Sequence, residues 1–204
     1  MTEPNPSPAR AAGFLAMASA VATVALLVAH PEGTAHDFAG LLREEAAGRA
    51  TDAVVHGGFI AVLAVQTVCY AVLARRLERL SALAGLVFFA FGAALLSASM
   101  VLDGLVIPAL AARYLATPET AHPLFALIGI AIGWLMPLGL AFQSAAVAAW
   151  GLALRGVMRV LAVLGGAAML AGLATGSPLA TMGALGGTVL WAALAGVLMV
   201  GRRI

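Results

Sequence analysis

The sequence predicts an all-α, polytopic integral membrane protein with six transmembrane helices. Of the 204 residues, 63% are hydrophobic and only 10% are charged, whereas a soluble domain carries about a quarter charged residues. Six apolar segments each supply the roughly 20 residues that a helix needs to cross a bilayer. These segments are residues 11–29, 53–74, 82–112, 123–154, 157–175 and 179–201. We therefore expect a lipid bilayer around a multi-pass chain in a cell membrane, such as a bacterial inner membrane.

The distribution of charge predicts the topology of these segments. All 11 basic residues are arginines, and most of them fall at alternate ends of the segments. The positive-inside rule therefore places both the N- and the C-terminus in the cytoplasm. We expect residues 1–10 to form a cytoplasmic tail and residues 11–204 to form one transmembrane domain. The arginines are not interleaved with aromatic side chains, so no nucleic-acid partner is expected.

The first helix and the loop that follows it have clear local signals. The helix should end at His30, because a residue before proline is disfavoured in a helix. An outer loop follows at residues 31–52. A helix is expected over residues 34–50 of this loop, where Thr34 and Asp37 have the spacing of a capping box. We expect this helix to lie at the membrane interface, over the bundle.

The later segments carry recognisable helix boundaries. An arginine-rich turn at residues 75–79 ends the second helix on the inner side. Thr120 can cap the fourth helix, with Pro123 in its first turn, where a missing N–H costs nothing. Ser177 followed by Pro178 opens the sixth helix in the same way.

The third segment contains an ionisable residue, Asp103, within a long apolar run. A carboxylate at membrane depth is costly and usually faces a protein interior or a wet cavity, so Asp103 marks a functional-site hypothesis. Pro108 follows five residues later and has no N–H to donate to the carbonyl of Gly104. We therefore expect the helix to be weakened beside the carboxylate. The fourth segment holds a similar pair, Gly133 and Pro137.

Polar residues share one face on four of the six segments when each is placed on an ideal helix at about 100° per residue. The fifth and sixth segments carry no ionisable group within the membrane. This pattern predicts that the first four helices surround a polar interior and that the last two pack alongside. The residues expected to line this pocket are Ser99, Gln66, Tyr70, His36, Asp37, Gly104 and Pro108.

All four histidines map to the outer end of the predicted membrane region, and Asp103 approaches the same level. Imidazole binds zinc, copper or iron, and a carboxylate can complete the ligand set. We therefore expect a metal ion or a haem b with a binding or redox role, and Gly57 and Gly58 would leave room for a macrocycle. The opposing interpretation is that each histidine only caps a helix end or packs at the interface. The predicted metal ligands are His30, His56, His122 and Asp103.

Other function classes fit the same features. The helix weaknesses at Pro108 and Pro137 are typical of the broken helices of transporters, which favours a small-solute transporter or a substrate-binding membrane subunit. Asp103 with a histidine could act as acid and base in an intramembrane enzyme on a lipid or quinone. The chain could also be an accessory subunit of a larger membrane complex, or form a homo-oligomer. No reaction-specific motif identifies catalytic residues, and the single cysteine, Cys69, excludes an intrachain disulfide.

Overall fold

The structure is a computed structural model that describes residues 8–31 and 33–201. Its described elements are all helices, and six spans are long and apolar enough to cross a membrane, which confirms the predicted fold class. Of the predicted tail, residues 1–7 lie outside the described part of the chain. The elements are α1 (Pro8–Ala29), α2 (Phe38–Leu77), α3 (Leu80–Val101), η1 (Leu102–Val106), α4 (Ile107–Tyr114), α5 (Pro118–Ala153), α6 (Gly156–Leu173) and α7 (Pro178–Val200). The third span comprises α3, η1 and α4.

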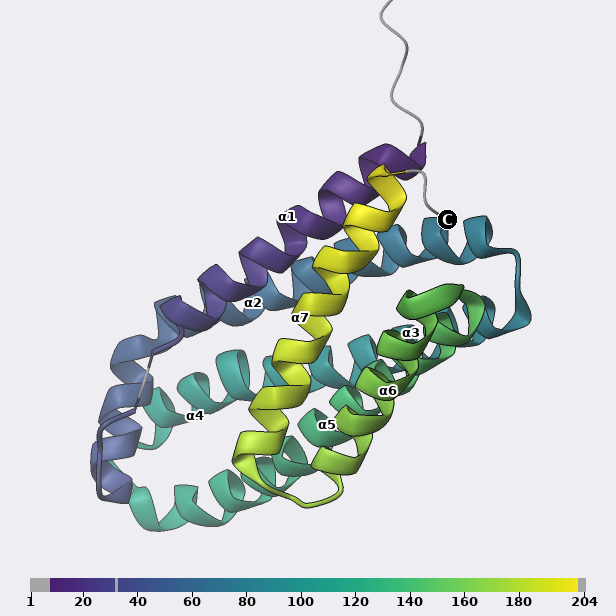
Figure 1. Cartoon of the computed structure of the whole chain (residues 1–204). Helices are drawn as coiled ribbons and strands as arrows, with labels where there is room; N and C mark the ends of the chain where they lie inside the picture. Colours follow the sequence, from purple (N-terminus) through teal and green to yellow (C-terminus); the bar gives the residue numbers. More distant parts are fainter. Residues whose placement is uncertain (1–7, 32, 202–204) are drawn as a thin grey trace, which may run out of the picture.

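The helix α7 is a central element of the bundle. Figure 1 shows that its last turns lie beside the first turns of α1. Gly13 and Gly196 permit this close approach, because a Cβ atom at Gly13 would lie 2.7 Å from the Gly196 carbonyl oxygen. Small residues at such contacts are typical of helix packing in membranes. The six-span fold class is as predicted, and α7, which the sequence places alongside the first four helices, also contributes to the wall of the central cavity.

The helix α2 is 40 residues long, which corresponds to about 60 Å at 1.5 Å per residue. It runs without a break through residues 38–52, where the sequence predicts a separate interfacial helix, because no proline divides the two segments. Asp37 caps its start by accepting a hydrogen bond from a backbone N–H three residues later, at 2.6 Å. The Glu44 carboxylate accepts bonds from the N–H groups of Thr34 and Ala35 and from the Thr34 hydroxyl. The start of α2 therefore anchors the loop that follows α1.

The third span is interrupted by the π-helical segment η1. The Ile107 N–H bonds to the first carbonyl of η1, five residues back instead of four. Pro108 stands in the first turn of α4, so the Gly104 carbonyl loses the N–H that an ordinary helix would provide. The weakness that the sequence predicts beside Asp103 thus takes the form of a π bulge, a feature that often marks functional sites.

Aromatic side chains form the core toward the arginine-rich end of the bundle. Trp150 is fully buried, and its indole N–H donates to the Ala82 carbonyl at 3.1 Å. Its ring stacks on Trp191 with the centroids 5.7 Å apart and lies 4.6 Å from the Tyr70 ring. A Cβ atom at Gly85 would lie 2.7 Å from the Trp150 ring. Glycine at this position therefore lets α3 approach the indole.

The substitution Gly85→Ala tests this packing. The added methyl group must displace the indole, and overpacking a core typically costs about 1–3 kcal/mol. We expect a lower Tm in thermal unfolding of the detergent-solubilised protein. The matched control is Gly183→Ala in α7, where a Cβ atom meets nothing within 4 Å, and its Tm should not fall. A Tm for Gly85→Ala equal to that of the wild type would contradict this packing.

Candidate functional site

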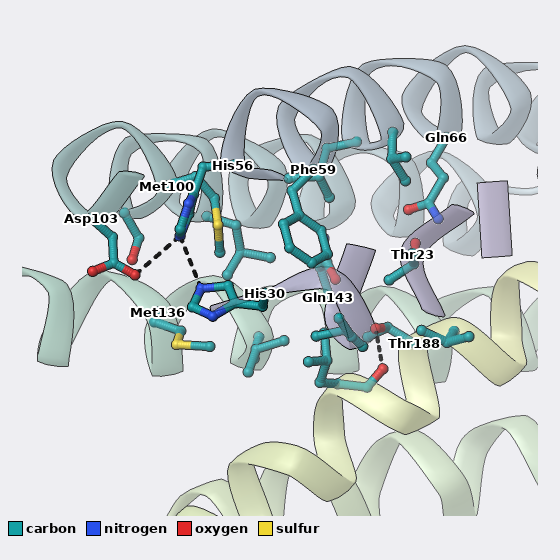
Figure 2. Close-up of a pocket in the computed structure, with 18 of the residues that line it drawn as sticks. Thr23, His30, His56, Phe59, Gln66, Met100, Asp103, Met136, Gln143 and Thr188 are labelled. Carbon is teal, nitrogen blue, oxygen red and sulfur yellow. Dashed lines mark hydrogen bonds and ion pairs between the residues drawn. The ribbon is translucent and has the colours of Figure 1, made fainter. Parts of the chain in front are cut away.

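A cavity of about 290 Å³ lies among α1, α2, α3, η1, α5 and α7. Its wall is mostly apolar, and Figure 2 shows His30, His56 and Asp103 grouped toward one end, with Gln66 and Thr188 toward the other. The cavity therefore connects an ionisable cluster with uncharged polar groups further along the bundle. The other polar residues that line it are Thr23, Ser99 and Gln143.

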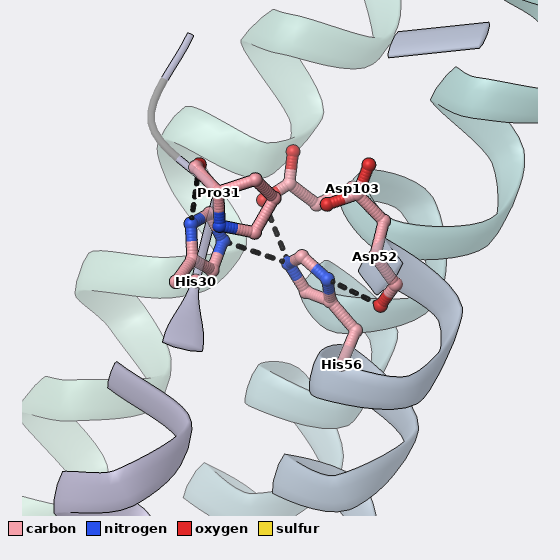
Figure 3. Close-up of polar contacts among 5 residues, drawn as sticks. All are labelled: His30, Pro31, Asp52, His56 and Asp103. Atoms are coloured by element: carbon pink, nitrogen blue, oxygen red, sulfur yellow. Dashed lines mark hydrogen bonds and ion pairs between the residues drawn. The ribbon is translucent and has the colours of Figure 1, made fainter. Parts of the chain in front are cut away.

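Three spans bring His30, His56 and Asp103 together (Figure 3). His30 directly follows α1, His56 lies in α2 and Asp103 lies in η1. The Nε2 atoms of the two histidines are 3.3 Å apart, and His56 Nε2 lies 3.2 Å from Asp103 Oδ2. One ligand atom from each of the three residues lies within 4.8 Å of the other two. The three side chains are therefore close enough to hold a metal ion.

Backbone carbonyls fix the orientation of both imidazole rings. His56 Nδ1 lies 2.9 Å from the Asp52 carbonyl oxygen, and His30 Nδ1 lies 3.0 Å from the Pro31 carbonyl oxygen. A carbonyl oxygen only accepts hydrogen bonds, so each Nδ1 must carry the proton and donate. In the neutral state, each Nε2 atom is then left with an unprotonated lone pair. This is the arrangement in which a histidine is prepared to bind a metal through Nε2.

The consequence is that three hydrogen-bond acceptors point at one another. Neutral His30 and His56 each present a lone pair, and ionised Asp103 presents only lone pairs. These lone pairs repel one another unless a positive charge lies between the three side chains. Either a proton shared by an imidazole and the carboxylate or a metal cation can supply that charge. The arrangement can therefore exchange protons and bind cations.

Gly104, within the π bulge, provides the space that the His56 ring needs. A Cβ atom at Gly104 would lie only 2.2 Å from His56 Cγ and 2.3 Å from His56 Nδ1. No other residue type fits against the ring at that position without a shift. The same five-residue segment therefore carries the carboxylate and the glycine that admits its histidine partner.

Two further carboxylates add negative charge around the cluster. Asp52 is buried and lies one helical turn before His56. Glu45 is half-buried, and both side chains interact electrostatically with His56 and Asp103. Opposite charge within a few ångströms favours the charged form of a group and attracts cations. The site therefore combines two imidazoles with an excess of carboxylates.

The other residues expected at the site divide into two groups. Ser99 and Gln66 are buried and line the cavity, and Gly104 contacts His56. Pro108 is buried next to the π bulge. Tyr70 does not line the cavity, because its ring packs between Phe89 and Trp150 in the aromatic core.

The remaining two histidines do not join the cluster of His30, His56 and Asp103. His122 packs edge-on against Phe38, with the ring centroids 4.9 Å apart. His36 is exposed, and its neighbour Asp37 serves as the helix cap of α2. Of the four histidines that the sequence places at one depth, His30 and His56 lie together with Asp103.

Sequence reasoning missed several residues around the site. Asp52 could have been found, because it precedes His56 by four residues and therefore lies on the same helix face. Thr188 and Met182 come from α7, a helix without ionisable groups within its span, so no sequence signal pointed to them.

Comparison of the chain with protein-family models, with curated proteins and with solved structures finds no match.

The backbone contacts make a spectroscopic prediction about the histidines. Neutral histidine in water mostly carries its proton on Nε2, but the carbonyl partners require Nδ1–H in His30 and His56. We expect ¹⁵N-histidine NMR of the metal-free protein to show a protonated Nδ1 in both rings, with any additional proton shared at Nε2. The signals are assigned by their loss in His30→Asn and His56→Asn, and His36 serves as the exposed control. An Nε2–H tautomer at both positions would contradict the proposed orientation.

Proposed function

We propose that this protein is an integral membrane protein that binds a transition-metal ion through His30, His56 and Asp103. The observation that supports it most directly is the convergence of two imidazole Nε2 atoms and one carboxylate oxygen, with both Nδ1 atoms held by backbone carbonyls. Under the positive-inside rule this end of the bundle faces away from the cytoplasm. The site would therefore take its ion from the outer side, with both termini in the cytoplasm.

The separations fit a tetrahedral ion. Two ligand atoms about 2.1 Å from a Zn²⁺ ion lie about 3.4 Å apart in tetrahedral geometry. The distances of 3.3 Å and 3.2 Å around His56 Nε2 are close to this value. The remaining separation, between His30 and Asp103, lies within 4.8 Å and must shorten. The Asp103 side chain is 42% exposed and has the freedom to rotate toward the ion.

The donor set favours zinc, copper or iron. Two imidazoles and one carboxylate suit each of these metals and leave a coordination position for an exchangeable ligand. Met100 and Met136 line the same cavity as the two imidazoles (Figure 2), and thioethers favour Cu⁺. A haem fits less well, because His30 Nε2 and Asp103 Oδ2 lie only 3.3 Å and 3.2 Å from His56 Nε2, which leaves no space for a macrocycle there.

Metal titration of ligand variants tests the proposal. We expect His30→Ala, His56→Ala and Asp103→Asn each to weaken Zn²⁺ binding by more than roughly 100-fold, because losing even a partner of a ligand costs about 10–100-fold. Competition with a chromophoric chelator in detergent measures the affinity, and Cu⁺ is titrated in parallel. His122→Ala is the matched control and should bind like the wild type. Equal affinity in His56→Ala and His122→Ala would refute the site.

The substitution Gly104→Ala provides a second test that removes no ligand. Its methyl group would collide with the His56 ring. We therefore expect weaker Zn²⁺ binding although all three proposed ligands are still present. The control is Gly57→Ala, next to His56 in sequence, where a Cβ atom meets nothing within 4 Å. A folded Gly104→Ala protein that binds Zn²⁺ with wild-type affinity would show that Zn²⁺ binding does not depend on the position of the His56 ring.

A second candidate function is the binding of a small apolar molecule with a hydrogen-bond acceptor, as in a solute-binding membrane subunit. It is favoured by Gln143, which lines the cavity, is 3% exposed and has no hydrogen-bond partner for Nε2 among the described residues. An unpaired buried donor costs about 1–3 kcal/mol. A carbonyl group on a bound molecule would satisfy it.

The substitution Gln143→Met tests this second function. Because it removes the unpaired amide at similar volume, we expect a Tm of the ligand-free protein at or above that of the wild type. Camphor, a rigid apolar ketone, should raise the Tm of the wild type more than bornane, its hydrocarbon analogue. This difference should disappear in Gln143→Met. Equal responses to the two compounds in the wild type would argue against a carbonyl-binding cavity.

A further inference from the structure

A second pocket lies at the opposite end of the bundle, where the turns between α2 and α3 and between α5 and α6 come together. Its volume is about 550 Å³. Three arginines line it, Arg76, Arg79 and Arg155, and no carboxylate does. The rest of its wall is apolar and consists of Leu77, Ala153, Leu154, Met158 and Leu198.

The positive charge of this arginine pocket has no carboxylate partner among the described residues, where the only ion pair joins His56 and Asp103. Arg76 donates one long hydrogen bond, of 3.5 Å, to the Met199 carbonyl, which leaves its positive charge unneutralised. Glu78 lies in the same turn but is exposed and does not line the pocket. The three guanidinium groups around this concave surface repel one another, and a bound anion would reduce that repulsion.

Two helix starts add to this positive charge. Arg79 and Arg155 are the N-cap residues of α3 and α6, and both have an extended backbone and no side-chain capping bond. An arginine side chain cannot accept a hydrogen bond, so neither N-cap side chain satisfies the first N–H groups of its helix. The positive ends of two helix dipoles thus lie next to the three guanidinium groups, which favours an anion at this place.

We infer that the arginine pocket binds a phosphate group, supplied by the head group of an anionic membrane lipid. Guanidinium groups bind phosphate oxygens in bidentate fashion, and basic pockets between transmembrane helices are typical sites for anionic head groups. The apolar residues Leu77, Leu154 and Met158 provide a surface for the beginning of an acyl chain. The pocket lies at the arginine-rich end, which the positive-inside rule assigns to the cytoplasmic leaflet, where anionic lipids attract basic residues.

Reconstitution in nanodiscs of defined lipid composition tests this inference. We expect phosphatidylglycerol or cardiolipin to raise the Tm relative to phosphatidylcholine, and native mass spectrometry to retain an anionic lipid on the protein. Replacing all three arginines with glutamine should remove the Tm difference, and each single Arg→Gln variant should weaken lipid retention roughly tenfold. Inorganic phosphate added to detergent-solubilised protein forms the second arm. A Tm increase with phosphate alone would assign the pocket to a free anion and overturn the lipid assignment.

The matched control is Arg49→Gln, an exposed arginine in the first part of α2, far from the turns that form the pocket. It should keep the full lipid effect. Arg79→Lys and Arg155→Lys test the inference even if the triple variant does not fold. Each keeps the positive charge but loses the bidentate geometry of the guanidinium group. We expect them to weaken retention while the protein stays folded. Lipid effects that are equal in the wild type, the triple variant and Arg49→Gln would overturn the inference.

Discussion

The mutual repulsion of three acceptor atoms at His30, His56 and Asp103 is the constraint on which the rest of the site depends. Their distances of 3.3 Å and 3.2 Å are too short for lone pairs without a cation or a proton between them. The protein fixes this arrangement with backbone groups, because the carbonyls of Pro31 and Asp52 hold the two Nδ1–H groups. Side chains can rotate away from a repulsive contact, but rings held by backbone carbonyls are less free to do so. The two imidazole rings are therefore held in place by the backbone, and an arrangement held in this way lowers the entropy cost of binding a ligand.

The π bulge links this chemistry to the helix sequence. Pro108 removes one N–H from the third span, and the helix responds by forming η1 around Asp103 and Gly104. The bulge thereby aims a carboxylate into the bundle, and the glycine beside it leaves room for the His56 ring. An ordinary α-helix through the same residues would change the direction of Asp103. The proline, the glycine and the carboxylate therefore act as one unit, which explains why they lie within six residues of one another.

The six spans and the interrupted helix at Asp103 could be predicted from the sequence because both depend on local properties, namely hydropathy and the missing N–H of Pro108. The sequence also placed His30 and His56 at the level of Asp103. Membrane depth, however, gives only one of the coordinates of a side chain. His122 shares that depth but packs against Phe38, because its lateral position depends on how the helices pack. The contribution of α7 to the cavity was missed for the same reason, since small and apolar residues reveal little about which helices they contact.

The two pockets are separated by the aromatic core, and this limits what the protein can do in the described conformation. Leu63 and Val189 line the cavity and pack against the core cluster, while Leu154 and Leu198 belong to that cluster and line the arginine pocket. Trp150 is a fully buried member of the same cluster. A solute that passed from one pocket to the other would have to displace side chains of this cluster, which the Trp150 hydrogen bond to the Ala82 carbonyl helps to fix. Close-packed cores resist such displacement. The described arrangement therefore favours binding at each end of the bundle over an open path between them.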